Sequence, residues 1–335
     1  MKSFPPGKIP YECLEKIISS TRVDDPRVII GPRPGEDAAV VDFDKKLLIA
    51  KSDPITMVEE NLGWYLVNIN ANDIAVMGGE PRWLLVTSLL PELGTDQAMV
   101  ERLHGEVISA CKELGINLIG GHTEVTQGLD RPILVGHMLG EATYKTLVDK
   151  RKIRSGDLIL LTKGIAIEGT AMIARMKEEE LTRELTDQLI KRAVNFIYEP
   201  GLSIVKDAKL AVKYGGIHGM HDPTEGGLLG GVFELMNGLD MGVELYESKI
   251  PVFPETVELC RYFGLDPLRL IASGALLVVA PAEQMVGLQH RYKQEGIESA
   301  IIGKVVESHE QIRIKRLTGW DYIHPDEGDE IAKIL

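Results

Sequence analysis

Cysteine is scarce in this chain, with three residues among 335. Cys13, Cys111 and Cys260 stand far apart, so no two of them have the close spacing of a zinc site. Sparse thiols without paired spacing are typical of proteins in a reducing compartment. The cysteine content therefore gives no sign of a disulfide framework or of structural zinc.

Long apolar runs are also absent. No stretch has the roughly 20 apolar residues that a transmembrane helix needs. Residues 1–16 contain no apolar core of the kind that a secretory signal has. We therefore expect a soluble, cytoplasmic protein that does not enter a membrane.

Positive charge is in deficit. The chain has 37 basic and 50 acidic residues, which gives a formal charge of −13. This balance argues against broad binding to nucleic acid or to anionic membranes, because both attract basic surfaces. A nucleotide ligand stays open, since carboxylates can hold the Mg²⁺ that accompanies phosphate groups.

Several well-known catalytic and nucleotide-binding motifs are missing. The sequence has no Walker A loop, no GxGxxG after a strand, no GxSxG and no HExxH. A phosphate-binding site in this chain would therefore need a different architecture.

What is present centres on residues 61–81, NLGWYLVNINANDIAVMGGEP. Apolar residues recur there at helical spacing, and two glycines followed by Pro81 predict the end of a helix. Asn68 and Asn72 lie four apart on one face, with Asp73 beside them. A carboxylate on an apolar helix is costly to bury unless it meets a cation or a metal. An exposed polar stripe is the alternative interpretation.

Acidic residues precede this helix at two places. A Gly- and Pro-rich stretch at 28–35 predicts a loop that delivers Gly35, Glu36 and Asp37. Residues 38–41 and 47–51 predict a pair of strands, and the second strand runs into Asp53. An ordinary turn remains the alternative for the first of these segments.

A glycine-rich segment follows the helix. A short strand at 117–119 is expected to end at Gly120 and Gly121, followed by His122 and Thr123. The exposed N–H groups of such a loop can form an anion-binding nest. A tight turn with incidental polar residues is the alternative.

The second glycine-rich segment is HDPTEGG at 221–227. Asp222 and Thr224 stand where a helix would be capped, and Gly226 permits a close approach of the backbone to a ligand. A plain capped helix start is the alternative.

The remaining pattern alternates strands and helices without a strict βαβ rhythm, which predicts a mixed α/β fold. A charged stretch at 145–156 indicates a boundary between two domains, 1–150 and 151–335. Helices are expected at 10–20, 186–196, 202–214, 255–263 and 283–295, and a further helix follows the segment 163–170 and runs through Met176. A helix is also expected at 95–114, with Thr95 or Asp96 as its N-cap and Gly115 after its end. Strands are expected at 83–90, 133–140, 158–162, 243–245, 275–279, 300–305 and 312–315, and 217–220 is a short segment that enters the next motif.

The order of the motifs resembles one superfamily. GEDAAVV, KSDP, NANDIAVMGGEP, GGHTEVT and HDPTEGG follow one another as in aminoimidazole ribonucleotide synthetase (PurM), hydrogenase maturation factor HypE, thiamine-monophosphate kinase (ThiL) and selenophosphate synthetase. The likeness covers nearly the whole chain, and the motif wording is closest to that of HypE-like proteins.

The resemblance implies a PurM-like two-domain α/β fold. Its N-terminal domain would pair with a twin in a homodimer through a shared β-barrel, and its C-terminal α+β domain would close over an ATP site. Asp37, Asp53 and Asp73 would hold Mg²⁺ and the polyphosphate, and Asp53, Asp73 and His122 would act in catalysis. The residues expected to contact ATP are Gly35, Glu36, Asp37, Asn72, Gly120, Gly121, Thr123, Asp222, Thr224 and Gly226.

Three departures from the family pattern bear on function. Glu36 stands where many members have aspartate, and His122 stands where HypE and ThiL often have aspartate. HypE resembles a carrier with a C-terminal cysteine, and no cysteine follows Cys260 in this chain. The sequence also lacks the Gly-rich N-terminal segment with Cys or Sec that selenophosphate synthetase uses. The chain therefore looks HypE-like without being a HypE carrier.

Three functions follow from these observations. The first is an ATP- and Mg²⁺-dependent enzyme that activates or phosphorylates a small-molecule or protein-borne acceptor. The second is a non-catalytic, nucleotide-binding accessory protein with a partner in metallocofactor maturation. The third is a phosphotransferase similar to thiamine-monophosphate kinase. No residue identifies the acceptor.

Overall fold

The structure is a computed structural model that describes residues 11–19, 21, 23–33, 35–307, 312–324 and 328–335. The chain forms two compact units. We call residues 24–31 and 37–147 the N-terminal unit, and residues 148–335, with 32–36 and the described residues before 24, the C-terminal unit. The division of the sequence at residue 150 stays a prediction. Within the described residues, no helix combines the length and the apolar character that crossing a bilayer requires.

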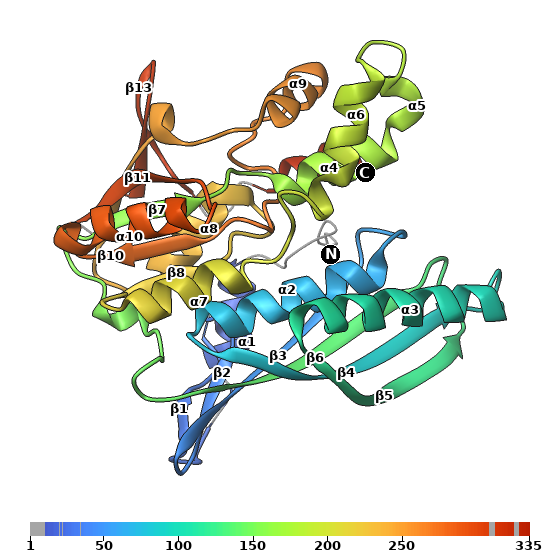
Figure 1. Ribbon diagram of the computed structural model, residues 1–335, viewed down its shortest axis with the longest axis horizontal. Coiled ribbons are helices and arrows are strands. Elements are labelled where there is room, and N and C mark those ends of the chain that lie inside the picture. The colour runs from blue at the N-terminus through green and yellow to red at the C-terminus, as the bar shows by residue number, and fades with distance from the viewer. Residues whose placement is uncertain (1–10, 20, 22, 34, 308–311, 325–327) are drawn as a thin grey trace. The chain divides into compact units, whose positions relative to one another are not determined.

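The N-terminal unit is a six-stranded sheet with two helices on one face (Figure 1). The strands run in the order β1-β2-β3-β6-β4-β5, and the β4–β5 pair is parallel while the other pairs are antiparallel. Helix α3 connects the two parallel strands. The elements are β1 (Val28–Ile30), β2 (Ala39–Phe43), β3 (Lys46–Ile55), α2 (Leu62–Val76), β4 (Glu80–Pro91), α3 (Gln97–Leu114), β5 (Asn117–Thr126) and β6 (Ile133–Ala142).

Helix α2 is the core of this unit, which confirms the helix predicted at the centre of the sequence. Every residue of it except Trp64 is buried. The helix lies directly on β6 because two glycines of that strand offer no side chain. A Cβ added to Gly136 would lie 2.6 Å from Nδ2 of Asn70, and one on Gly140 would lie 2.2 Å from Cγ2 of Ile74. The alternative of an exposed polar stripe on α2 is therefore wrong.

Helix α3 begins and ends where the sequence indicates. The side chain of Asp96 accepts a hydrogen bond from the N–H of Met99 at 2.8 Å, as an N-cap does. Gly115 ends the helix with φ 69°, which glycine adopts without strain. The buried residues of the helix are Leu103, Val107, Ala110 and Cys111.

Two predictions for this unit are wrong. Strand β5 does not stop before Gly120 but runs to Thr126, paired with β4 on both sides of a register shift at Ile119. Gly120 and Gly121 continue the strand with φ of 157° and 149°, and a Cβ on Gly121 would lie 1.9 Å from the carbonyl oxygen of Val86. The glycines thus serve strand pairing in place of a curled anion nest. In addition, the stretch expected to be a loop after residue 28 contains β1.

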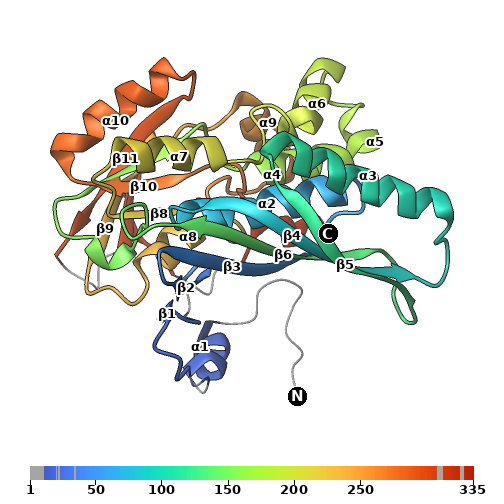
Figure 2. The same cartoon turned by 60° about the horizontal axis from the view of Figure 1, so that its bottom comes forward.

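The C-terminal unit is a seven-stranded mixed sheet in the order β13-β12-β9-β11-β7-β10-β8. Helix α10 packs on β7 and β11 with α7 beside it (Figure 2). The strands are β7 (Leu158–Thr162), β8 (Gly219–His221), β9 (Gly242–Tyr246), β10 (Leu277–Ala280), β11 (Ser299–Val306), β12 (Ile312–Arg316) and β13 (Gly319–Tyr322). The helices are α1 (Tyr11–Ser19), α4 (Ile167–Met176), α5 (Glu178–Leu181), α6 (Asp187–Val194), α7 (Val205–Tyr214), α8 (Gly227–Met236), α9 (Pro254–Phe263) and α10 (Ala282–Gln294), with short 3₁₀ turns η1 (Lys150–Lys152), η2 (Asn195–Ile197), η3 (Glu247–Lys249) and η4 (Glu330–Lys333).

A half-buried lysine joins three loops of this unit. Lys163 follows β7 with φ 57°, and its Nζ donates to the carbonyl oxygens of Gly201, Ser203 and Gly274 at 3.3, 2.7 and 2.8 Å. Burial lowers the pKa of Lys163, and the carboxylate of Asp207 opposes that effect. The ammonium group therefore has its three donors satisfied by the backbone alone.

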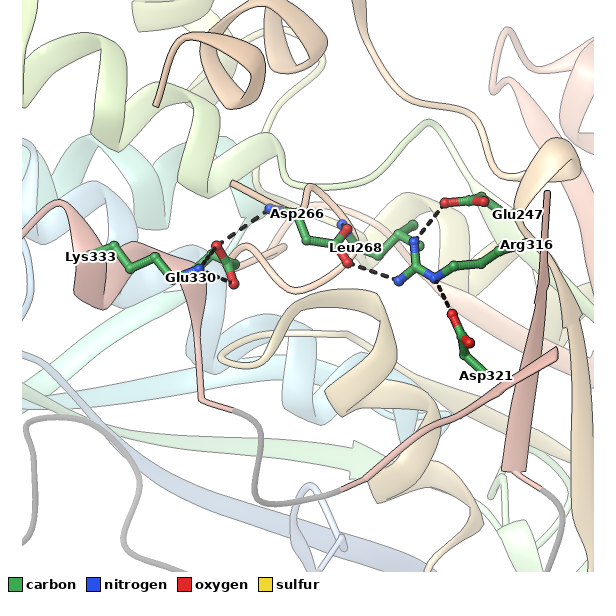
Figure 3. Close-up of polar contacts among 7 residues, drawn as sticks. All are labelled: Glu247, Asp266, Leu268, Arg316, Asp321, Glu330 and Lys333. Carbon is green, nitrogen blue, oxygen red and sulfur yellow. Dashed lines mark hydrogen bonds and ion pairs between the residues drawn. The ribbon is translucent and has the colours of Figure 1, made fainter. Parts of the chain in front are cut away.

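The end of the chain packs against the same unit, which sequence reasoning did not predict. Arg316 of β12 pairs with the carboxylates of Glu247, Asp266 and Asp321 at 2.7, 2.9 and 3.1 Å (Figure 3). The N–H of Asp266 donates to Oε2 of Glu330 in η4 at 3.4 Å. This network links the last turn of the chain to the sheet.

Candidate functional site

The most unusual polar group in the N-terminal unit is a lysine between two aspartates. Nζ of Lys51 lies 3.0 Å from Oδ1 of Asp73 and 3.7 Å from Oδ2 of Asp53. Asp73 is 5% exposed, and its Oδ2 has no hydrogen-bond partner among the described residues. The predicted catalytic aspartates are thus brought together, around a cation that was not predicted to take part.

The geometry of β3 explains how Lys51 reaches Asp73. Side chains alternate along a strand, so every second residue faces the same side. Leu47 and Ile49 are fully buried, Lys51 and Asp53 are the next two residues of that row, and Ile55 is again buried. The lysine and the aspartate therefore interrupt an otherwise apolar row that faces α2. This alternation was the signal that could have identified Lys51 from the sequence.

The charges of this group act on one another. Burial alone would lower the pKa of Lys51, but the carboxylates of Asp73 and Asp53 outweigh it and raise that pKa. Burial raises the pKa of Asp73 against the attraction of Lys51, and the negative charges of Asp53 and Asp37 add to the rise. Lys51 is therefore a permanent positive charge surrounded by aspartates.

Three amide side chains lie on the same helix as Asp73 and are buried as well. Asn68, Asn70 and Asn72 are at most 2% exposed. Nδ2 of Asn70 donates to the carbonyl oxygens of Leu66 at 2.9 Å and of Asp53 at 3.3 Å. Asn70 was not among the predicted site residues, although its amide ties α2 to the strand that carries Lys51. The predicted Asn72 lies in the fully buried part of the same helix.

The predicted residues of β5 belong to a different place in the same unit. A cavity of about 350 Å³ lies between α3 and the sheet. Its lining residues are Val86, Ser88, Leu90, Val100, Leu103, His104, Val107, Leu118, Gly120, Gly121, His122, Thr123 and Leu134, and the lysine–aspartate group is not among them. His122 is exposed and its Nε2 lies 3.1 Å from Oε2 of Glu124, which lowers the pKa of that carboxyl.

The HDPTEGG segment lies in the C-terminal unit. His221 and Asp222 are 4% and 2% exposed, and Nε2 of His221 lies 3.3 Å from Oε2 of Glu234. Helix α8 begins after Gly226, which has φ 82°, and no side chain caps it. The expectation that Asp222 and Thr224 cap the helix is therefore wrong.

Gly35 and Glu36 belong to the same unit as that segment, whereas Asp37 belongs to the N-terminal unit. The carbonyl oxygen of Gly35 accepts a hydrogen bond from Nζ of Lys150 at 2.6 Å, and Lys150 also donates to the carbonyl oxygen of Glu234 at 3.2 Å. Lys150, in the charged stretch at the predicted boundary, thus holds two backbone carbonyl groups of the C-terminal unit together.

Two carboxyl groups of this unit were not predicted, Glu168, which is buried, and Asp329, which is half-buried. Burial, helped by the charges of Glu225 and Asp329 and opposed by Ser273, raises the pKa of Glu168 to about 8. Asp329 accepts hydrogen bonds from the N–H groups of Gly226, Ile331 and Ile271 at 2.7, 2.8 and 3.2 Å. Burial nevertheless raises the pKa of Asp329 to about 6.

Two mixed α/β units with buried acidic residues at the motif positions define a class, that of the AIR synthase related proteins. The N-terminal domain model of this family matches residues 35–142, and its C-terminal domain model matches residues 154–315. The chain belongs to this family, which confirms the resemblance read from the motif order.

Two relatives match over most of the chain. A protein of Methanocaldococcus jannaschii that is named for hydrogenase expression and formation is 23% identical, over 98% of this chain and 97% of its own length. The carbamoyl dehydratase HypE of Rhodobacter capsulatus is 26% identical, over 79% of this chain and 76% of its own length.

Solved structures of the family share the fold, which confirms the predicted PurM-like architecture. HypE in a HypE–HypF complex superposes with a TM-score of 0.75 at 21% identity, covering 94% of this chain and 99% of that one. HypE in complex with ATP superposes with a TM-score of 0.71 at 21% identity, covering 93% of this chain and 89% of that one. ThiL with AMPPCP and TMP superposes with a TM-score of 0.68 at 21% identity, covering 90% of this chain and 91% of that one.

Proposed function

We propose that the chain is an ATP-dependent enzyme that activates or phosphorylates a small-molecule or protein-borne acceptor. The observation that carries the proposal is the charged group of Lys51, Asp53 and Asp73 on β3 and α2, in which Asp73 is buried and Lys51 and Asp53 are half-buried. Keeping such charges inside a core is unfavourable, so they indicate a task beyond stability. Relatives in the same family are named carbamoyl dehydratase, and family structures contain ATP or AMPPCP.

This chemistry suits the group. Phosphoryl transfer depends on positioned charges and needs little covalent participation from the protein. Lys51 would attract phosphate oxygens, and Asp53 and Asp73 would keep its ammonium in place. The predicted ATP contacts through Gly35, Glu36, Asn72, Gly120, Gly121, Thr123, Asp222, Thr224 and Gly226 remain part of the proposal, as does a catalytic role for His122.

Mg²⁺ would accompany ATP and neutralise its phosphates. Asp37, Asp53 and Asp73 are the proposed ligands, and Asp73 offers the unpartnered, buried Oδ2. Its Oδ1, in contrast, already accepts a hydrogen bond from Lys51. The donor set fits a metal ion only in part, and we derive no catalytic step through it.

We propose calorimetric titration of ATP, with and without Mg²⁺, as the test, together with a phosphate-release assay. The Asp73→Asn variant keeps the shape of the side chain and removes the charge of a proposed metal ligand, so we expect ATP affinity in the presence of Mg²⁺ to fall about tenfold or more. Asp130→Asn, in an exposed position, is the matched control and should bind like the wild type. Equal ATP affinity of wild type and Asp73→Asn would contradict the proposed site.

The alternative is an accessory protein that binds nucleotide without turnover in hydrogenase maturation. It is favoured by the name of the M. jannaschii relative and by the structure of HypE with HypF. ATP binding without phosphate release, together with a stable partner in native lysate, would support it. Phosphate transfer to thiamine monophosphate would instead support the ThiL-like alternative.

A homodimer is part of the proposal. Strand β5 pairs only with β4 among the described strands, and apolar side chains on it are exposed, with Ile119 at 54% and Val125 at 57%. An edge strand with such side chains is usually covered by another chain. Light scattering of the wild type and of Val125→Lys would test this, and a wild-type monomer would contradict it.

A further inference from the structure

Lys51 has a position that an ordinary surface salt bridge does not explain. Its side chain is 23% exposed, and the side chain of its partner Asp73 is 8% exposed. A lysine in the apolar row of a strand that faces the core costs more free energy than an apolar residue of similar size. The charges of the group are also unbalanced, because one ammonium group faces the carboxylates of Asp53 and Asp73 and the negative charge of Asp37.

The position of the ammonium resembles that of a bound ion. It contacts one carboxylate at hydrogen-bond distance and lies near a second, which come from different elements of the fold. A divalent cation shared by the same two carboxylates would need their oxygens at about 2.1 Å. It would then stand against the positive charge of Lys51, and the two cations would repel each other.

We propose that Lys51 is a resident cation that keeps a divalent metal ion out of the Asp53–Asp73 pair while no nucleotide is bound, and that its ammonium binds a phosphate group of the incoming nucleotide. The metal ion then enters together with the phosphates, which supply the negative charge that the lysine has cancelled. Only the binding of a nucleotide phosphate by Lys51 rests on the proposed function. The exclusion of a metal ion does not, because it is a property of the protein without nucleotide.

The first experiment titrates Mn²⁺, without nucleotide, into the full chain and follows the free ion by electron paramagnetic resonance. Wild type should show no site tighter than about 1 mM. Lys51→Met, which keeps the length of the side chain, should gain a site that binds Mn²⁺ about tenfold tighter or more. Lys46→Met is the matched control, because Lys46 lies on the same strand as Lys51 but is exposed. Its Nζ pairs with Oε1 of Glu141 at 2.7 Å.

Equal Mn²⁺ binding by wild type and Lys51→Met would overturn the proposal. Folding of the variant is checked by circular dichroism, and if it does not fold, wild type still decides. A wild-type Mn²⁺ site tighter than about 1 mM that Asp73→Asn abolishes would overturn the proposal, and no such site would support it.

The second half is tested by ATP affinity without added metal. We expect Lys51→Met to bind ATP about tenfold more weakly than wild type and than Lys46→Met. An unchanged affinity would refute the contact with phosphate. If wild type binds no ATP under any condition, the proposed function fails, while the Mn²⁺ result still decides whether Lys51 acts as the resident cation.

Discussion

Replacing Glu168 by glutamine should change how the stability of this protein depends on pH. Glu168 lies in the first turn of α4 and is 4% exposed, and its Oε2 has no hydrogen-bond partner among the described residues. Glutamine keeps the size and the polar end of the side chain but cannot lose a proton. The substitution therefore isolates the titration of one buried carboxyl group.

The magnitude follows from linkage between protonation and folding. The pKa of Glu168 is raised from 4.5 to about 8, chiefly by burial. Between these values the folded chain binds a proton that the unfolded chain has released, so stability is greatest at low pH and is lost as pH rises through 8. For this one group, the free energy of unfolding should fall by about 2 kcal/mol between pH 6 and pH 8.

The assay is urea unfolding of wild type and Glu168→Gln at pH 6, 7 and 8. The variant should gain about 2 kcal/mol relative to wild type over this range. Glu255→Gln is the control, since Glu255 is also buried but its Oε1 pairs with Nε of Arg192 at 2.7 Å. Fluorescence of Trp320 reports on the C-terminal unit, and Trp64 and Trp83 can be replaced by phenylalanine in all variants.

The result that would refute the reasoning is a constant difference between wild type and Glu168→Gln at all three pH values. It would mean that Glu168 is ionised in the folded protein over the whole range. A rise in Glu255→Gln as large as that in Glu168→Gln would also refute the reasoning, because the effect would then not be specific to the unpaired carboxyl group of Glu168.

Two further predictions concern packing. Gly136→Ala should destabilise the N-terminal unit by about 1–3 kcal/mol, because the new methyl group would meet the amide of Asn70. Gly105→Ala in α3 is the matched control, because no atom lies within 4 Å of the added Cβ and φ is not positive. Thermal unfolding measures both, and equal losses would contradict the role of the contact. Lys163→Met should destabilise by about 3 kcal/mol, because three partly buried carbonyl groups lose their donor; Lys46→Met should cost less than about 1 kcal/mol as an exposed pair, and a similar loss in both variants would contradict the prediction.

The predictions that held from the sequence rest on local signals. Asp96 and Gly115 mark the ends of α3, and the hydrophobic spacing of residues 61–81 marks α2, because caps and periodicity are properties of neighbouring residues. The motif order identified the family in the same way, since it needs only the succession of short segments.

The features that were predicted wrongly or not at all depend on contacts between residues far apart in the sequence. Gly120 and Gly121 read as a loop by themselves, and only the partner strand β4 makes them part of a strand. Lys51 was not predicted as a site residue, because its role depends on the contact with Asp73, which is 22 residues further along the chain. The role of Asp329 could not be predicted for the same reason. Its carboxylate accepts hydrogen bonds from the N–H groups of Gly226 and Ile271, which no local pattern connects to it.

The three carbonyl oxygens around Nζ of Lys163 have a consequence for the ionic conditions that the protein tolerates. A ring of backbone carbonyls is the shell that proteins offer to potassium. Here the cation is the end of a side chain, so it cannot be washed out or exchanged for sodium. The loops that meet at Lys163 should therefore keep their arrangement when potassium is replaced by sodium or when salt is removed by dialysis.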